Sequence, residues 1–277
     1  MPIDLRGRPI AITGASSGIG AATALACAAA GMPVALGARR LDRLESLAEQ
    51  IRARGGVALA VACDVTNPND GARLVARARE TFGSLYAVYA NAGYGVEGPV
   101  ELTSDADFRA ILETNFYGTL NTIRPALPVL RANPGPHRGH VLICSSCLAK
   151  LPIPYYSAYG ASKAAQSHLG RAMDLELRGE GIRASTVHPI GTRTEFRATL
   201  RGTGNIGAAH TPDGLMQDPA LVARETVACL RRPRPEVWTG FRGRLIRVAM
   251  AAAVACPGIE TPILRRMVKP RPGAGAR

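Results

Sequence analysis

Short apolar runs alternate with longer amphipathic runs along most of this chain. Runs of about five or six residues, bounded by glycine, proline or polar residues, are typical of buried β-strands. We expect such strands at Arg8–Thr13, Pro33–Ala38, Val57–Cys63, Leu85–Ala90, His140–Ser145, Arg183–His188 and Glu236–Gly240. The pattern therefore predicts a seven-stranded sheet.

The longer runs between these strands have the composition and spacing of helices. They lie at Ile19–Ala30, Leu41–Arg54, Pro68–Phe82, Asp105–Leu130, Tyr159–Gly179 and Pro219–Arg231. Repeated strand–helix–strand units give a parallel sheet, and right-handed crossovers place helices on both of its faces. The sequence predicts an α/β protein with a Rossmann-type, doubly wound, mostly parallel sheet.

Two segments depart from this alternation. Residues 192–217 are dominated by glycine, threonine and proline, and they follow the end of a predicted strand. Long irregular segments at that position are usually functional, so we expect a substrate lid there. We interpret residues 1–240 as one dinucleotide-binding and catalytic domain, and residues 241–277 as a C-terminal extension.

Composition is that of a globular protein: 277 residues, of which 47% are hydrophobic. The first residues do not resemble a secretory signal, and no apolar run is long enough to span a bilayer, so a cytoplasmic location is expected. The six cysteines are scattered, which favours reduced thiols. Cys144 and Cys147 form a single C-x-x-C without a second pair or a nearby histidine pair, so no metal site is expected.

The net charge of +13 is uneven, because residues 241–277 hold eight Arg or Lys and one Glu, a net +7. No pattern typical of nucleic-acid binding accompanies this charge. Residues Leu245–Cys256 are apolar except for Arg247, and arginines flank them. Such a segment could lie on an anionic membrane surface, cover a subunit interface or cover the substrate pocket. Peripheral membrane contact through residues 241–277 is one of these alternatives.

Candidate chemistry begins at the glycine-rich turn Thr13–Gly20, between the first strand and the first helix. Glycine lets the backbone turn tightly and approach a ligand closely. The helix that follows offers free N–H groups to a phosphate. The turn therefore predicts a dinucleotide site that includes Gly14, Ser16, Ser17, Gly18, Ile19 and Gly20.

The end of the second strand indicates which dinucleotide is bound. An enzyme for NAD usually has an acid there, whereas this chain has Arg39 and Arg40. Arginine suits a 2′-phosphate by charge and by its forked donors. We therefore expect NADP(H), with Arg39 favoured over Arg40 as the binding residue; the alternative is that both are solvated surface charges.

Tyr159 and Lys163 are four residues apart at a helix start, so they share one face of the helix. A free tyrosine has a pKa of about 10, and a nearby ammonium lowers that pKa towards the range useful for proton transfer. Ser145 and Ser146 end the fifth strand, and Asn91 ends the fourth. All of these segments open at one edge of the predicted sheet.

This combination resembles the short-chain dehydrogenase/reductase family, in its form of roughly 250 residues, from about residue 8 to residue 194. The matching positions are Thr13–Gly20, Asp64, Val65, Asn91, Ala92, Gly93, Asn115, Ser145, Ser146, Tyr159, Lys163, Pro189 and Thr194.

The resemblance implies a catalytic role for four residues. Tyr159 would be the general acid in reduction and the base in oxidation. Lys163 would lower the pKa of Tyr159 and bind the nicotinamide ribose. Ser146 would hold the substrate oxygen, and Asn115 would anchor a water relay to Lys163.

Other matching residues would bind the cofactor. Asp64 and Val65 would lie beside the adenine, and Asn91, with Ala92 and Gly93, would support the sheet and the cofactor. Pro189, Thr192 and Thr194 would contact the nicotinamide side. The family's usual Pro-Gly is Pro189-Ile190 here, which puts the contacts to the nicotinamide amide in question.

We interpret the chain as an NADP(H)-dependent oxidoreductase that moves a hydride between the nicotinamide and a carbonyl or secondary alcohol. One alternative is a non-catalytic NADP(H)-binding sensor or scaffold. Another is a membrane-surface lipid or steroid dehydrogenase/reductase. The substrate is not specified by the sequence, and the family resemblance implies a homodimer or homotetramer.

Overall fold

The computed structural model describes residues 1–202 and 216–255, and its centre is a seven-stranded sheet. The strands are β1 (Ile10–Thr13), β2 (Val34–Ala38), β3 (Ala58–Ala62), β4 (Ala87–Ala90), β6 (Gly139–Cys144), β7 (Ile182–His188) and β9 (Glu236–Trp238). Their order is β3-β2-β1-β4-β6-β7-β9, and all of the pairings are parallel. The chain therefore reverses its direction of winding between β1 and β4, which confirms the doubly wound prediction.

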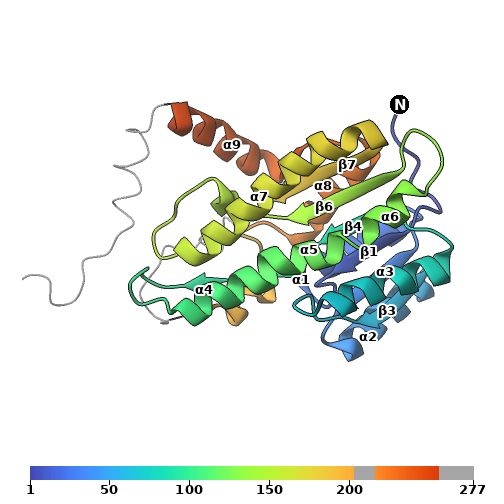
Figure 1. Cartoon of the computed structure of the whole chain (residues 1–277), viewed down its shortest axis with the longest axis horizontal. Helices are drawn as coiled ribbons and strands as arrows, with labels where there is room; N and C mark the ends of the chain where they lie inside the picture. The colour runs from blue at the N-terminus through green and yellow to red at the C-terminus, as the bar shows by residue number, and fades with distance from the viewer. Residues whose placement is uncertain (203–215, 256–277) are drawn as a thin grey trace, which may run out of the picture.

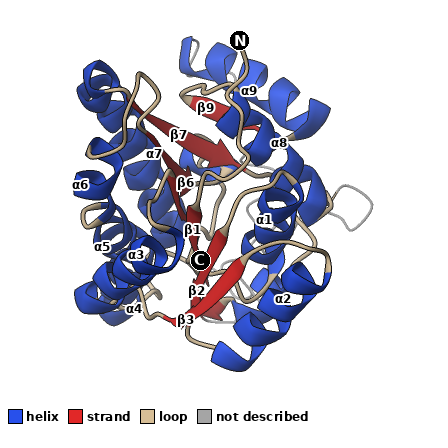
Figure 2. Cartoon of the chain, turned by 90° about the vertical axis from the view of Figure 1, so that its right-hand side faces the viewer, coloured by secondary structure: helices blue, strands red, loops and turns tan. Residues whose placement is uncertain are grey.

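Helices cover both faces of this sheet (Figure 2). They are α1 (Gly18–Ala29), α2 (Leu41–Ala53), α3 (Pro68–Phe82), α4 (Asp105–Leu112), α5 (Gly118–Ile123), α6 (Ala126–Arg131), α7 (Ser157–Leu177), α8 (Pro219–Arg231) and α9 (Gly240–Ala255). In Figure 2, α1, α2 and α8 lie on one side of the sheet, and α3 to α7 lie on the other.

Alternating side chains of the strands build two apolar cores. Ile10 and Ile12 of β1 are fully buried in the core beneath α1 and α8, whereas Ala11 belongs to the core on the opposite face. Successive side chains of a strand point to opposite faces, so a strand buried on both sides is apolar throughout. This is why the predicted strands lack polar alternation.

Two helices begin at the predicted residue because their start signals are strong. Asn67 accepts a hydrogen bond from Asn69 N before α3, and Asp218 accepts one from Ala220 N before α8. In both helices a proline follows the capping residue, where its missing N–H costs nothing.

The long helix predicted over Asp105–Leu130 is divided in the structure. A π-helical turn at Glu113–Tyr117 separates α4 from α5, and a short turn containing Pro125 separates α5 from α6. Proline lacks the N–H that a continuous helix needs. The sequence prediction also omitted a small parallel sheet that pairs β5 (Val96–Glu97) with β8 (Arg201–Gly202).

Part of the predicted lid and of the C-terminal extension lies outside the described residues, at 203–215 and 256–277. The described part of the lid contains a 3₁₀ turn at Glu195–Thr199. The described part of the extension forms α9, which runs out from the body of the protein (Figure 1). Among the described residues, no helix combines the length and hydropathy needed to cross a bilayer.

Candidate active site

The predicted site residues gather at the carboxyl edge of the sheet. The glycine-rich turn follows β1, Asn91 follows β4, Ser146 follows β6 and Pro189 follows β7. Because all four strands are parallel neighbours, these segments meet at one edge, beside the point where the winding reverses. Ligands bind at that position in open α/β sheets.

Close backbone packing requires glycine in the turn after β1. Gly14 has a φ of 65°, and a β-carbon on Gly20 would lie only 2.3 Å from the Gly14 carbonyl oxygen. Asn91 Nδ2 donates to the carbonyls of Thr13 and Gly14, at 3.0 and 3.3 Å, and so ties the turn to β4. The support of the cofactor by Asn91, which the resemblance implied, stays a prediction.

The first turn of α1 has no side-chain cap. Ser17 precedes the helix, but its side chain makes no capping hydrogen bond. The N–H groups at a helix start carry partial positive charge and need acceptors. An uncapped start of a 12-residue helix, held beside a tight glycine turn, is suited to a phosphate.

Of the two arginines after β2, the structure places Arg40 on the glycine-rich turn. Its guanidinium donates to the hydroxyls of Ser16 and Ser17, both at 3.1 Å. Arg39 is exposed and makes no side-chain hydrogen bond or ion pair within the described residues. The assignment of the 2′-phosphate to Arg39 thus stays a prediction, and Arg40 is a second candidate that the sequence interpretation ranked lower.

An acidic residue of the predicted lid also contacts Arg40. Glu195 pairs with Arg40 at 3.0 Å and with Arg43 of α2 at 2.5 Å. Hydrogen bonds from these two cations lower the pKa of the Glu195 carboxyl, and Arg43 has the larger effect. Sequence reasoning missed Glu195, because its partners lie about 150 residues away in the chain. The 3₁₀ turn at Glu195–Thr199 is therefore joined by ion pairs to Arg40 and Arg43.

Asp64 and Val65 follow β3 at the same edge. Asp64 is partly buried, and its Oδ1 accepts hydrogen bonds from the Thr66 amide and hydroxyl. Val65 is buried against Gly118 at the start of α5, where an added β-carbon would lie 2.6 Å from Val65 Cγ2. Their position at this edge is compatible with the predicted adenine contacts.

Tyr159, Lys163 and Ser146 lie together in a buried cluster. The relative exposures of the three are 9%, 4% and 6%, respectively. Lys163 Nζ lies 5.7 Å from the centre of the Tyr159 ring and donates to the Cys144 carbonyl oxygen at 2.7 Å. The Ser146 hydroxyl and the Tyr159 hydroxyl are hydrogen-bond partners. The structure therefore brings the predicted acid–base residue and its two partners together.

The pKa of Tyr159 differs from the sequence expectation. Burial raises this pKa well above its ordinary value, and the hydrogen bond with Ser146 only partly offsets the rise. Burial also lowers the pKa of Lys163 to about 8, because the charged ammonium is less well solvated. A lowering of the Tyr159 pKa by Lys163 is not observed in this arrangement, in which the ammonium is directed at a backbone carbonyl.

Asn115 lies in the π-helical turn and is fully buried beside this cluster. Its Nδ2 donates to the Tyr94 carbonyl and to the Ser162 hydroxyl, each at 3.0 Å, and its backbone oxygen accepts from Gln166 Nε2 at 2.7 Å. π-turns occur frequently at functional sites. Asn115 thus holds α7 and the segment after β4 in register, and the predicted water relay stays a prediction.

His188 contacts the backbone of Ser146 and helps to hold it in place. Its Nδ1 lies 3.0 Å from the Ser146 carbonyl, its Nε2 lies 2.9 Å from the Thr186 hydroxyl, and its ring stacks on Trp238 at 4.7 Å. Both ring nitrogens are therefore engaged, and burial lowers the pKa of His188, which favours the neutral ring. The histidine fixes the position of the serine segment.

The segment after β7 is anchored by a residue that the sequence interpretation missed. Gln217 Nε2 donates to the hydroxyls of Thr192 and Thr239, at 3.1 and 2.8 Å. Thr192 in turn donates to the Ile190 carbonyl at 2.7 Å. Ile190, which replaces the usual glycine, therefore still takes part in an ordered connection between Pro189 and the lid.

Aromatic residues form the wall of the site around Tyr159. Phe196 of the 3₁₀ turn packs on the Tyr159 ring, with ring centres 5.4 Å apart, and Tyr94, Tyr156 and Phe108 belong to the same apolar cluster. Tyr156 also donates to Glu97 at 3.2 Å. These contacts place four aromatic side chains in one apolar cluster with Tyr159.

The five described cysteines are buried free thiols. Burial raises the pKa of Cys147 to about 11 and raises that of Cys144, so neither is a reactive thiolate at neutral pH. No cluster of three metal-binding side chains occurs within residues 1–202 and 216–255. Cys256 lies outside the described residues.

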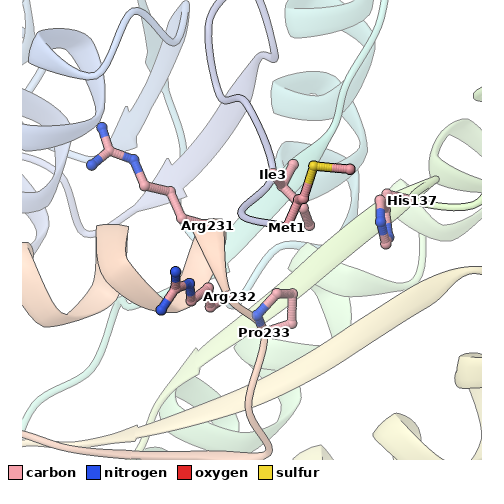
Figure 3. Close-up of a pocket in the computed structure, with 6 residues that line it drawn as sticks. All are labelled: Met1, Ile3, His137, Arg231, Arg232 and Pro233. Carbon is pink, nitrogen blue, oxygen red and sulfur yellow. The ribbon is translucent and has the colours of Figure 1, made fainter.

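A separate open pocket of about 360 Å³ lies among Met1, Ile3, His137, Arg231, Arg232 and Pro233 (Figure 3). These residues precede β1, β6 and β9, so the pocket is at the amino edge of the sheet, opposite the catalytic cluster. Figure 3 shows both guanidinium groups directed away from Met1 and His137. The pocket is therefore no part of the candidate active site.

Comparison with known proteins agrees with this geometry. A model of the family described as short chain dehydrogenase matches residues 8–204. An uncharacterized oxidoreductase of Listeria monocytogenes is 35% identical over 198 residues, which cover 71% of this chain and 79% of the relative.

Solved structures with the same fold carry nicotinamide cofactors. An alcohol dehydrogenase from Thermococcus sibiricus, in complex with 5-hydroxy-NADP, has a TM-score of 0.73 and 28% identity, covering 83% of this chain and 94% of that one. A 3-ketoacyl-(acyl-carrier-protein) reductase from Brucella melitensis, in complex with NADH, also has a TM-score of 0.73 and 28% identity, covering 83% of this chain and 92% of that one.

Proposed function

The chain belongs to the short-chain dehydrogenase family and is an oxidoreductase, and on that premise we propose that it interconverts a carbonyl and a secondary alcohol with NADP(H). The observation that carries the proposal is the buried cluster of Tyr159, Ser146 and Lys163 at the carboxyl edge of the sheet. A phenol and a hydroxyl side by side can both bond to one carbonyl oxygen.

Three observations show that the residues of this chain fit a dinucleotide. The glycine-rich turn has no room for a side chain at Gly20, and the start of α1 offers uncapped N–H groups. The Arg40 guanidinium donates hydrogen bonds to Ser16 and Ser17 of the same turn. These groups would hold the phosphates, and the bound nicotinamide supplies the hydride chemistry.

The catalytic cluster then acts on the substrate oxygen. Ser146 orients that oxygen and donates a hydrogen bond to the charge that develops on it. Tyr159 delivers a proton to the same oxygen. Because burial raises the pKa of Tyr159, the residue is a neutral phenol at pH 7, which is the form that donates a proton.

Lys163 and Asn115 position the tyrosine. Lys163 is held one helical turn from Tyr159 and directed at the Cys144 carbonyl, and its ammonium is available to a ribose hydroxyl. Asn115 fixes the packing of α7 through Ser162 and Gln166. Activity is tested with a panel of ketones, aldehydes and alcohols followed by NADPH absorbance.

Exchange of Arg40 for alanine tests the cofactor preference. We expect Arg40→Ala to raise the Kd for NADPH by roughly 10-fold or more, since a charge-assisted bond to the 2′-phosphate is lost, and to change the Kd for NADH by less than about 3-fold. Titration of each cofactor by calorimetry measures both constants. Arg39→Ala is the matched variant, and an effect confined to Arg39→Ala would assign the phosphate to that residue instead.

Exchange of Glu195 for glutamine tests whether the lid competes with the cofactor. The carboxylate pairs with Arg40 and Arg43, so a 2′-phosphate at Arg40 must displace it. Exposed ion pairs are weak, and we expect Glu195→Gln to tighten NADPH by about 2- to 5-fold and to leave NADH unchanged. Glu45→Gln, at the exposed pair with Arg52, is the control. Weaker NADPH binding by Glu195→Gln would show that the carboxylate assists the cofactor.

A further inference from the structure

Helix α9 is attached to the protein by one face. Gly243 is buried there, and a β-carbon on it would meet Trp238 at 3.5 Å and Ile190 Cγ2 at 3.9 Å. Ile246, three residues on, is half-buried on the same side. The remainder of the helix extends away from the sheet, towards the end of the described chain (Figure 1). Its opposite face is therefore open.

That open face is apolar. Phe241, Leu245 and Val248 have exposed fractions of 73%, 53% and 67%, and Ala252 is exposed as well. Their spacing of four, three and four residues places all of them on one side of an α-helix. At a rise of 1.5 Å per residue they form a stripe about 16 Å long. We refer to Phe241, Leu245, Val248 and Ala252 as the α9 stripe.

Arginines border the α9 stripe. At about 100° per residue, Arg242 and Arg244 lie on the two sides of Phe241. Arg244 pairs with Glu225 at 2.8 Å, whereas Arg242 and Arg247 are exposed and have no carboxylate partner among the described residues. Within the whole chain, residues 241–277 hold eight Arg or Lys and one Glu. Within the described helix Gly240–Ala255 itself, the charged residues are three arginines, with no acidic residue among them.

The positive charge of the arginines beside the α9 stripe favours one kind of covering surface over another. In a symmetric contact between two copies, each arginine border would face an equally cationic one. An anionic lipid surface offers the complementary charge, and an apolar stripe with arginine borders is the form of helix that lies in the plane of such a surface.

We propose that α9 docks the protein on anionic membranes, with the α9 stripe inserted among the lipids and with Arg242 and Arg247 on the headgroups. The proposal rests on the exposed face of α9 and is independent of the proposed reaction. It develops one of the three alternatives that the sequence left open for Leu245–Cys256.

The test is flotation of the full-length protein with vesicles of phosphatidylcholine alone or with about 30% phosphatidylglycerol. We expect binding to the anionic vesicles that weakens with added salt. The triple variant Phe241→Ser, Leu245→Ser, Val248→Ser should reduce the bound fraction at least about 10-fold, because the apolar insertion is lost. Arg242→Gln should weaken binding by about 5-fold.

In a matched control variant, three exposed apolar residues outside α9 are replaced by serine. Val100→Ser, Leu102→Ser and Leu175→Ser remove side chains with exposed fractions of 62%, 60% and 76%, and this variant should bind vesicles as the wild type does. Circular dichroism and thermal unfolding verify that both variants are folded. Equal binding by wild type and the α9 variant, or equal binding to both vesicle types, overturns the proposal. A smaller particle mass of the α9 variant in light scattering, without a change in flotation, would assign the stripe to a contact between copies.

Discussion

Replacing Tyr159 by phenylalanine is expected to lower kcat for carbonyl reduction by roughly 10²- to 10⁴-fold, the usual contribution of a positioned general acid. The change removes one oxygen and keeps the ring, so the packing of Phe196 on residue 159 is preserved. The glycine-rich turn and Arg40 are untouched, and the Kd for NADPH should therefore stay within about 2-fold of wild type. Loss of turnover with intact cofactor binding is the result that identifies the proton donor.

Steady-state absorbance measurements at 340 nm, with the best substrate of the carbonyl panel, give kcat. Fluorescence titration gives the Kd for NADPH. Tyr117→Phe is the matched control, because Tyr117 is half-exposed on the π-turn, and it should retain full activity. Equal rates for Tyr159→Phe and wild type would remove Tyr159 from the mechanism. A non-catalytic NADP(H)-binding sensor or scaffold would instead show cofactor binding and no turnover in the wild type.

Replacing Asp174 by alanine is expected to lower the free energy of unfolding by about 3 kcal/mol, because it leaves the partly buried Arg183 guanidinium and the buried Ala184 amide without their acceptor. Asp174 is 1% exposed, pairs with Arg183 at 2.7 Å and with Arg178 at 2.5 Å, and accepts a hydrogen bond from the Ala184 amide at 3.0 Å. These bonds join α7 to β7. The loss should appear in urea unfolding, and Tm should fall by roughly 10 °C.

The Asp174 carboxyl also makes the free energy of unfolding depend on pH. Burial alone would raise the pKa of Asp174, but hydrogen bonds from Arg183 and Arg178 outweigh it and lower the pKa from 3.8 to about 2. A depressed pKa contributes stability that is present above pH 3.8 and is lost as the pH falls towards 2. The difference in unfolding free energy between wild type and Asp174→Asn should therefore be constant from pH 7 to 5 and shrink below pH 4. Glu180→Gln, at the exposed pair with Arg131, serves as control. A difference that does not change with pH would mean that Asp174 acts through packing alone.

The sheet and the place of the site could be predicted from the sequence because both depend on local patterns. Each parallel strand is an apolar run, and Thr13–Gly20 marks the crossover to α1. The helices that begin with a capping residue and a proline, α3 and α8, start where predicted. Since parallel strands end at one edge, the order of motifs alone brought Asn91, Ser146 and Tyr159 together.

Features that depend on tertiary contacts could not be predicted. Asp174 appears in the sequence as one more polar residue of a helix, and only the packing of α7 on β7 shows that it is buried. Neighbouring side chains in extended backbone point in opposite directions, so the sequence could not decide which of Arg39 and Arg40 faces the turn. The pairing of β5 with β8 involves two residues on each strand, too few for a periodic signal.

The π-turn at Glu113–Tyr117 has a consequence for how this site can vary. A π-turn contains one residue more than an α-helical turn, and removing a residue would rotate α4 against α5 by about 100°. Asn115 lies in this turn and bonds to Tyr94, Ser162 and Gln166, so the rotation would disturb contacts that depend on its present position. A deletion in this stretch thus breaks the packing of α7 in one step, whereas substitutions at the exposed positions around it are tolerated. Related chains should accordingly differ in side chains along residues 113–117 and agree in its length.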